Sequence, residues 1–356
     1  MSSMTAAVAV RQPVFVGVDT HKATHHVAVI DADGTVLDDR EFPATVGGDR
    51  AVTGWLGQWE IARVGVEQSG TYGAGLTRTL AAAGHAVIDV NMPDLTVRAR
   101  AGKSDPIDAV MAAEAVRTGR AGVIAKDRAG VIESIRLLQT ARHSAVKARS
   151  AALTQLGDLT VIAPDSVRER LGSTSRSHAR AAATFRADRT RLHNPDQAAK
   201  LALRSVAARV SVLDAEIAEL DRALTGLVTR TAPRLLALPQ VGVHAAAQLL
   251  VTFGQAPHRI ASDAKFARLI GVAPVPASSG KTHRMRLHAG GDRQANKTVH
   301  MIAIGRLRSH QPAIDYLTRR VSEGLSKKDA IRAMKRLITR ELYGALKADL
   351  TALDGL

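Results

Sequence analysis

The chain of 356 residues contains no cysteine. Disulfide bonds, thiolate zinc sites and cysteine nucleophiles are therefore excluded, and the composition agrees with a reducing compartment. No apolar run approaches the roughly 20 residues that a membrane span requires. The first residues also lack the basic start and the long apolar core of a signal peptide. We therefore expect a cytoplasmic protein without a membrane partner.

Aromatic residues are also scarce, at 3% of the chain, and acids are outnumbered, with 33 Asp and Glu against 49 Lys and Arg. The net charge is +16, and residues 281–340 alone hold 15 Lys and Arg against 4 acids. This excess favours a polyanionic partner, nucleic acid more than a membrane surface, although a basic solvated surface is an alternative. Because few aromatic rings are present for base stacking, phosphate contacts should carry most of the affinity.

The pattern of apolar residues divides the chain into three regions. Residues 13–120 alternate short apolar strands with helices and include a hairpin that turns at Asp33-Gly34, which predicts a mixed α/β sheet domain. Strand signals fade in residues 121–230, which we expect to be helical. Residues 231–345 predict a mainly α-helical C-terminal domain.

Residues 203–227 carry apolar side chains at alternating steps of three and four, which is the seam of a coiled coil. The seam consists of Leu203, Val206, Val210, Leu213, Ile217, Leu220, Leu224 and Leu227. Two interpretations stay open: an intramolecular helix pair with residues 131–158, or a coil that joins two subunits. Both hold if helical hairpins from two subunits pack together.

Residues 233–254 read as a helix, a tight "PQVG" turn and a second helix, which resembles a helix-hairpin-helix element. In that element the backbone N–H groups of the turn face a DNA phosphate. Gln240 stands where a glycine is common, and a plain helix–helix turn is the alternative. Residues 273–297 form a small-polar and basic stretch that we expect to be a long functional loop.

The stretch "GKSDPIDA" places two acids three residues apart, Asp105 and Asp108. We predict Asp105 as a helix N-cap with Pro106 at the first helical position, so both carboxylates emerge on one side of the helix start. Capping and a favourable helix dipole explain the pair without any ligand. A divalent metal also explains it, provided that further carboxylates arrive from elsewhere.

Two such carboxylates end apolar strands. Asp19 ends the first strand and Glu67 ends the fourth, so both should project from the carboxyl edge of the sheet, where α/β folds bind ligands. If the helix at Asp105 packs beside that edge, it adds Asp105 and Asp108 to the same place. Four close carboxylates repel, and Mg²⁺ removes that cost because hard cations take carboxylate oxygens. One or two metal ions at such a site would polarise a phosphate.

These segments resemble a known family. "VFVGVDTHKATHHVAVID", "VGVEQSG" and "GKSDPIDA" resemble the three parts of a DEDD, RuvC-like (ribonuclease-H-type) nuclease domain. They most resemble the DEDD transposases of bacterial insertion sequences, which are related to the Piv invertase. "FARLIGVAPVPASSGKTHRMRLHAGGDRQANKTVHMI" resembles the C-terminal transposase domain of that family. The resemblance covers roughly residues 13–345.

The resemblance implies a transposase that acts through a covalent serine–DNA intermediate in an Mg²⁺-dependent reaction. The serine motif of the family matches "PASSGK", which implies Ser279 as the nucleophile, with adjacent Ser278 as the alternative. A phosphate-contacting loop would explain the same letters without catalysis. The catalytic and metal-binding acids implied are Asp19, Glu67, Asp105 and Asp108.

The resemblance also implies the partners: donor DNA, target DNA and a structured non-coding guide RNA, bound by a homo-oligomer between dimer and tetramer in the bacterial nucleoid. We expect the nucleic-acid contacts to come from basic residues near the two motifs, namely Lys103, Lys281, Arg284, Arg286, Arg293 and Lys297. His21 and Lys22, next to Asp19, are candidates for substrate phosphate. His25, His26, Trp55 and Trp59 are expected to be structural.

Three other classes of protein compete with a transposase. A hydrolytic RuvC-like nuclease such as a junction resolvase needs the four acids but no serine. An actin-like ATPase or sugar kinase has a similar first strand pair, but His21 and Lys22 crowd the place where such proteins admit phosphates. An inactive nucleic-acid-binding relative disagrees with the presence of all four acids and the serine motif. We therefore expect a transposase.

Overall fold

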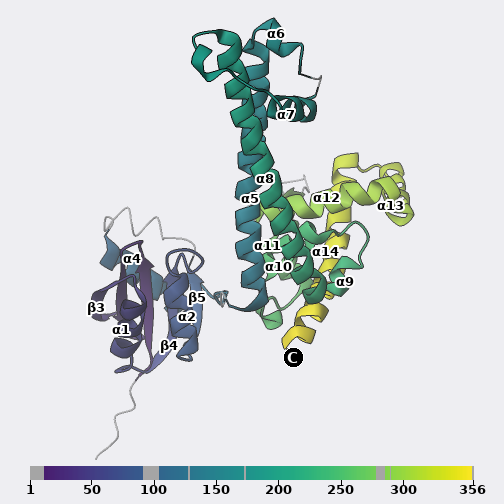
Figure 1. Cartoon of the computed structure of the whole chain (residues 1–356). Helices are drawn as coiled ribbons and strands as arrows, with labels where there is room; N and C mark the ends of the chain where they lie inside the picture. Colours follow the sequence, from purple (N-terminus) through teal and green to yellow (C-terminus); the bar gives the residue numbers. More distant parts are fainter. Residues whose placement is uncertain are drawn as a thin grey trace, which may run out of the picture. The chain divides into compact units, whose positions relative to one another are not determined.

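The computed structural model describes residues 12–90, 104–126, 129–171, 174–277, 285–288 and 290–354 (Figure 1). The chain forms two compact units. The first comprises the residues up to Gly130 together with Gly254–Ala261, and the second comprises Val131–Phe253 and Ser262–Leu356.

The first unit is built on a five-stranded mixed sheet with strand order β3-β2-β1-β4-β5. Its strands are β1 (Val14–Thr20), β2 (Thr24–Ile30), β3 (Val36–Pro43), β4 (Ile61–Glu67) and β5 (Val87–Val90). Strand β2 pairs antiparallel with both β1 and β3, whereas β4 pairs parallel with both β1 and β5. The β2–β3 turn is the predicted one: Gly34 has a φ of 96°, and the Asp31 carboxylate accepts hydrogen bonds from the backbone of Asp33 and Thr35. The mixed α/β domain predicted for this region is confirmed.

One face of this sheet is covered by helices α1 (Val46–Leu56) and α2 (Ala74–Ala82). Alternate residues of the central strands point toward them and form the main core of the unit. That core consists chiefly of Val16, Val18, Val64, Val66, Val52, Leu56, Leu76 and Leu80. Trp55 and Trp59 pack against this core, and their rings contact each other edge to face with centroids 4.9 Å apart, as expected for structural residues.

The opposite face carries helix α4 (Asp105–Arg117) at very short range. Gly17 of β1 and Gly65 of β4 are paired in the register of the two strands. A Cβ atom on Gly17 would lie 2.0 Å from the carbonyl oxygen of Ala109, and one on Gly65 would lie 2.7 Å from that of Ala112. The helix therefore rests on bare strand backbone, which only glycine allows.

The start of α4 differs from the prediction by one residue. Ser104, not Asp105, is the N-cap: it is extended, and its carbonyl oxygen accepts the first helical hydrogen bond from the N–H of Asp108 at 3.0 Å. Serine and aspartate are both common N-caps, so side-chain preference could not separate them, and this backbone bond decides. Asp105 and Asp108 both lie in the first turn, as expected.

Two long antiparallel helices dominate the second unit, α5 (Gly130–Ile162) and α8 (Pro195–Thr231) (Figure 1). Ion pairs Arg142–Asp221 and Arg149–Asp214 join them. At their far end they pack with α6 (Asp165–Arg168) and α7 (Ser175–Ala183) around an apolar core. The intramolecular helix pair that was one of the two interpretations is therefore present.

The seam of α8 is not uniformly covered within the unit. Leu203, Val206, Val210 and Leu224 are buried. Leu213, Ile217 and Leu220, in the middle, are only half-buried. The helix pair within one chain thus leaves part of the predicted seam exposed.

The rest of the second unit is mainly helical, as predicted. Its helices are α9 (Pro233–Leu236), α10 (Val243–Phe253), α11 (Asp263–Leu269), α12 (Arg293–Ser309), α13 (Gln311–Ser322) and α14 (Lys327–Asp354). Short 3-10 turns lie at Arg189–Arg191 here and at Pro257–Arg259 in the first unit. Within the ranges that the structure describes, no helix is both long and apolar enough to cross a bilayer.

One feature of this unit was not predicted. The stretch expected to be a loop contains a two-stranded sheet, β6 (Pro274–Pro276) and β7 (Met285–Leu287). Three-residue strands are too short to show alternation, and the two prolines of β6 are tolerated because β6 is an edge strand. Helix α13 lies within the stretch that was predicted to be mainly helical.

The close approach of α4 gives a stability prediction. Gly17→Ala should lower the free energy of unfolding of the full-length protein by at least about 2 kcal/mol, because the new methyl group overlaps the backbone of α4. Gly54→Ala is the matched control: Gly54 is exposed inside α1 with open space at its Cβ, so the change should be neutral or stabilise by about 0.5–1 kcal/mol. Urea unfolding followed by circular dichroism measures both. Equal stability of the two variants would show that α4 does not rest on β1 as described.

Candidate functional site

Two parallel strands place carboxylates at one edge of the sheet. Val18 and Val66 are paired in the register of β1 and β4, and the next residue of each strand is Asp19 and Glu67. The Thr20 hydroxyl donates a hydrogen bond to the backbone oxygen of Glu67 at 2.9 Å, which joins the two strand ends. Both acids therefore lie at the carboxyl edge, where the sequence predicted them.

The two acids also share a face. Because side chains alternate along a strand, Asp19 lies on the same face as Gly17, and Glu67 on the same face as Gly65. That is the face on which α4 rests. Asp19 is 4% exposed, so its carboxylate is held below the protein surface.

Helix α4 brings the other two acids to this face. Asp108 is 2% exposed, whereas the side chain of Asp105 is 44% exposed. Both lie in the first turn, where the positive end of the helix dipole favours negative charge. The structure thus brings Asp19 and Asp105 together directly, and it places Glu67 and Asp108 on the same face of the same unit.

A histidine completes this cluster. The Nε2 atom of His21 lies 3.0 Å from Asp19 Oδ2 and 3.4 Å from Asp105 Oδ1. One ligand atom from each of the three residues lies within 4.8 Å of the other two, a spacing that could hold a metal ion. Sequence reasoning assigned His21 only to phosphate; its position two residues after Asp19, on the β1–β2 connection, was the available signal.

The neighbouring histidines are structural, as expected. Buried His25 lies 3.7 Å from the Asp49 carboxylate on the α1 side of the sheet. Burial lowers the pKa of His25 and raises the pKa of Asp49, so the fold favours the neutral forms of both. His26 Nε2 lies 2.6 Å from Asp39 Oδ2 across the β2–β3 pair.

The two serines of the serine motif are not among the residues that the structure describes. Ser278, Ser279, Lys281 and Arg284 lie outside the described residues, and so does Lys103. The pair Pro276 and Met285, which face each other in the β6–β7 sheet, brackets the serine-bearing segment on both sides.

The other predicted nucleic-acid contacts are accessible. Arg286 on β7 is exposed, and so are Arg293 and Lys297 at the start of α12. Asp292 is the N-cap of α12, and its carboxylate accepts hydrogen bonds from the backbone of Gln294 and Ala295. The first two turns of α12 therefore present two exposed cations on a capped helix end.

Several cations of the basic segment are structural instead. Arg306 is 3% exposed and pairs with Glu341, while Arg336 pairs with Asp263. Lys335 is 6% exposed and donates a hydrogen bond to Asn296, and burial lowers its pKa. Composition alone therefore overestimates the positive surface that this segment offers to a polyanion.

The turn between α9 and α10 is tight. Gln240 has a φ of 64°, the left-handed conformation that glycine adopts most easily. Its side chain is fixed by a hydrogen bond to the Ser309 hydroxyl at 3.0 Å. A glycine at this position would adopt the same conformation with less strain.

A mixed α/β sheet domain with acids at its carboxyl edge, followed by helical regions, fits a RuvC-like DEDD transposase. A family model for DEDD transposases of the IS110 type matches residues 16–161, and a model described as "Transposase IS116/IS110/IS902 family" matches residues 232–318. The chain belongs to this family of insertion-sequence transposases, which are enzymes that cleave and rejoin DNA. The predicted family and enzyme class are thereby confirmed.

A curated relative agrees with this assignment. The chain is 26% identical over 397 aligned positions to the "Insertion element IS900 uncharacterized 42 kDa protein" of Mycobacterium paratuberculosis. The match covers 94% of this chain and 96% of the relative.

A DEDD transposase domain implies a divalent metal. The residues present suit one: carboxylate oxygens are the ligands that hard divalent cations take, and an imidazole nitrogen lies between two of them.

Proposed function

We propose that this transposase performs Mg²⁺-dependent strand cleavage and exchange, with Asp19, Glu67, Asp105 and Asp108 as the metal ligands. The observation that carries the proposal is the convergence of acids from two parallel strands and one helix start on a single face of the sheet. When bound, Mg²⁺ neutralises the carboxylates and polarises the scissile phosphate as a Lewis acid.

The graded exposure of the acids supports this role. Asp19 and Asp108 are buried, which fixes their positions, while Asp105 and His21 are both about 44% exposed on the side chain. A phosphodiester would therefore approach from the side of Asp105 and His21. The contacts of His21 with Asp19 and Asp105 orient both carboxylates.

The proposed nucleophile is the hydroxyl of Ser279, with Ser278 as the alternative. Its oxygen attacks the phosphorus, so a serine–phosphate bond forms while one P–O bond of the DNA backbone breaks. The serine loses its proton and the released strand end gains one. Because a phosphodiester replaces a phosphodiester, the reverse attack can rejoin strands without ATP.

We further propose that a structured non-coding RNA guides the protein to donor and target DNA. The composition supports this division: cations are abundant and aromatic side chains few, which suits recognition of phosphates and duplex shape, with sequence left to base pairing. The α9–α10 turn, as a helix-hairpin-helix-like element, would contribute backbone N–H groups to a phosphate.

Assembly is proposed to use the exposed part of the α8 seam. Leu213, Ile217 and Leu220 occupy consecutive seam positions yet are only half-buried by their own chain. A second copy of the α5–α8 hairpin would cover them, which combines the intramolecular and intermolecular interpretations of the seam.

Metal binding can be tested without measuring activity. Mg²⁺ at ten times its Kd should raise the Tm of the full-length protein by roughly 3 °C. Asp19→Asn and Asp108→Asn should each abolish this shift, because each removes a ligand charge. Asp33→Asn, in the exposed β2–β3 turn, should keep it. A shift that survives in both site variants would contradict the proposed ligands.

The serine is tested by trapping its DNA adduct. The protein is incubated with Mg²⁺, labelled element-end DNA and the adjacent non-coding RNA, and is then denatured in detergent. We expect labelled DNA to migrate with wild-type protein and with Ser278→Ala, but not with Ser279→Ala or Asp108→Asn. Nicked DNA without an adduct in any variant would instead indicate a hydrolytic nuclease.

The seam is tested by a charge substitution. Ile217→Asp should convert the oligomer to a monomer, measured by light scattering on a sizing column, because a carboxylate cannot be buried between apolar seams. Val212→Asp is the matched control, since Val212 is 66% exposed on another face of α8. If both variants keep the wild-type mass, the seam is not an interface between subunits.

A further inference from the structure

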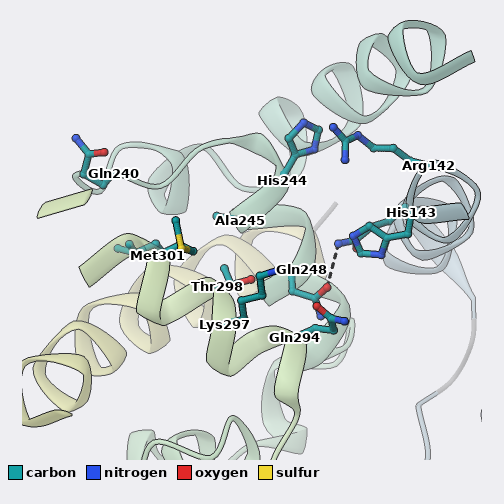
Figure 2. Close-up of a pocket in the computed structure, with 12 residues that line it drawn as sticks. Arg142, His143, Gln240, His244, Ala245, Gln248, Gln294, Lys297, Thr298 and Met301 are labelled. Carbon is teal, nitrogen blue, oxygen red and sulfur yellow. Dashed lines mark hydrogen bonds between the residues drawn. The ribbon is translucent and has the colours of Figure 1, made fainter. Parts of the chain in front are cut away.

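A pocket of about 290 Å³ lies within the second unit, and none of the proposed metal ligands lines it (Figure 2). Helices α5, α10 and α12 form its walls. We call it the glutamine pocket, after the carboxamides that line it together with cationic side chains. The residues that matter are Gln139 and His143 on α5, His244 and Gln248 on α10, and Gln294 and Lys297 on α12.

A chain of hydrogen bonds fixes the inner wall of the glutamine pocket. Gln139 Nε2 donates to Gln248 Oε1 at 3.0 Å, and Gln248 Nε2 donates to the Thr252 hydroxyl at 3.2 Å. The Thr252 hydroxyl donates in turn to the Asp292 carboxylate at 2.7 Å, and that carboxylate caps α12. Gln139 and Thr252 are 7% and 3% exposed. The carboxamides are therefore held in place before any ligand arrives.

The glutamine pocket is electrostatically positive. Arg142 and Lys297 line it along with two histidines, and among the described residues no Asp or Glu lines it. Figure 2 shows Arg142 and His143 on one side and Lys297 and Thr298 on another, with Gln248 nearby. Two acids lie beside it: Asp221 is paired with Arg142 and lies 3.4 Å from His244, and Asp292 accepts the hydrogen bond of Thr252.

The pKa values of the two histidines are lowered partly by the neighbouring cations. Burial lowers the pKa of His143, and Arg142, Lys147 and Lys297 lower it further. Burial also lowers the pKa of His244, with Arg142 adding to the effect and Asp221 opposing it. Because the cations of this pocket repel one another, an anionic ligand would be stabilised there by their combined charge.

We propose that the glutamine pocket receives one unpaired nucleotide of a nucleic-acid strand, with its phosphate against Lys297 and the histidines and its base edge against the carboxamides. This inference rests on the proposed nucleic-acid function but assigns a separate contact to it. Carboxamides offer a donor and an acceptor side by side, which is the pattern that base edges present. Cations supply the phosphate contact.

Size and shape select an unpaired nucleotide. A volume of about 290 Å³ lies just below the usual range for small-ligand pockets, so it can admit no more than a single nucleotide. A base that is paired inside a duplex cannot enter a pocket, so the nucleotide must be extruded or single-stranded. Met301 and Ile302 supply an apolar surface for the base in place of an aromatic ring.

The test uses the full-length protein with 4-thiopyrimidine-labelled oligonucleotides, as single strands and duplexes of DNA and of RNA. Irradiation should attach unpaired strands to peptides of α5, α10 or α12, and duplexes much less. The arm that crosslinks better, DNA or RNA, identifies the source of the nucleotide. Attachment of both strand types only to other peptides would overturn the proposal, even if the protein binds nucleic acid well.

Affinity provides the second measurement. Lys297→Met should weaken binding of unpaired strands about tenfold and reduce the salt slope by about one, because one phosphate contact is lost. Gln294→Ala should weaken it less and leave the salt slope unchanged. Lys347→Met, at an exposed position of α14, removes the same charge elsewhere and should have almost no effect.

The outcomes separate this inference from the proposed function. Equal effects of Lys297→Met and Lys347→Met, with normal wild-type binding, would overturn the pocket and leave the transposase mechanism standing. A loss of the DNA adduct in Ser279→Ala with a normal crosslink at the pocket supports both independently. Wild-type protein that binds no strand at all would overturn both.

Discussion

The contact between α4 and the bare backbone of β1 and β4 is the constraint on which the acidic site depends. Gly17 and Gly65 let the helix lie against the strands at a distance that any side chain would prevent. The helix start is thereby brought to the strand ends that carry Asp19 and Glu67. A metal site works only if its ligands are held in place to well within about 1 Å. The two glycines therefore determine the geometry of the site by setting the position of α4, although neither of them is a ligand.

In the second unit, some of the many cations form ion pairs within the fold, and others stay exposed. Arg306 and Arg336 serve the packing of α12, α11 and α14, and Arg142 and Arg149 hold the helix pair together. Exposed cations lie at the start of α12 and on β7, and also at Arg308, Lys327 and Lys328. The charge available to a polyanion is therefore smaller than the composition of the basic segment suggests, although it is still spread over several helices.

Much of the first unit could be predicted because its signals are local. Strand alternation, the Asp33-Gly34 turn and acids at the ends of parallel strands each follow from a few neighbouring residues. The sequence placed His21 beside Asp19, but its second contact, with Asp105, could not be predicted because the two residues are far apart in the chain. The chain from Gln139 to Gln248 was equally hidden, since its members are 109 residues apart and no periodicity links them. The serine segment stays a prediction from resemblance, because it lies outside the described residues.

The first unit is not continuous in sequence: Gly254–Ala261 belongs to it, although the helix pair and α10 come between. Arg259 of this segment donates a hydrogen bond to the backbone oxygen of Ile124 at 3.1 Å. During synthesis on the ribosome, the sheet domain therefore receives its last segment only after the α5–α8 hairpin and α10 have been made. A fragment that ends at Gly130 would lack this segment, and a single proteolytic cut near that residue would leave the two units joined by the chain on either side of Gly254–Ala261.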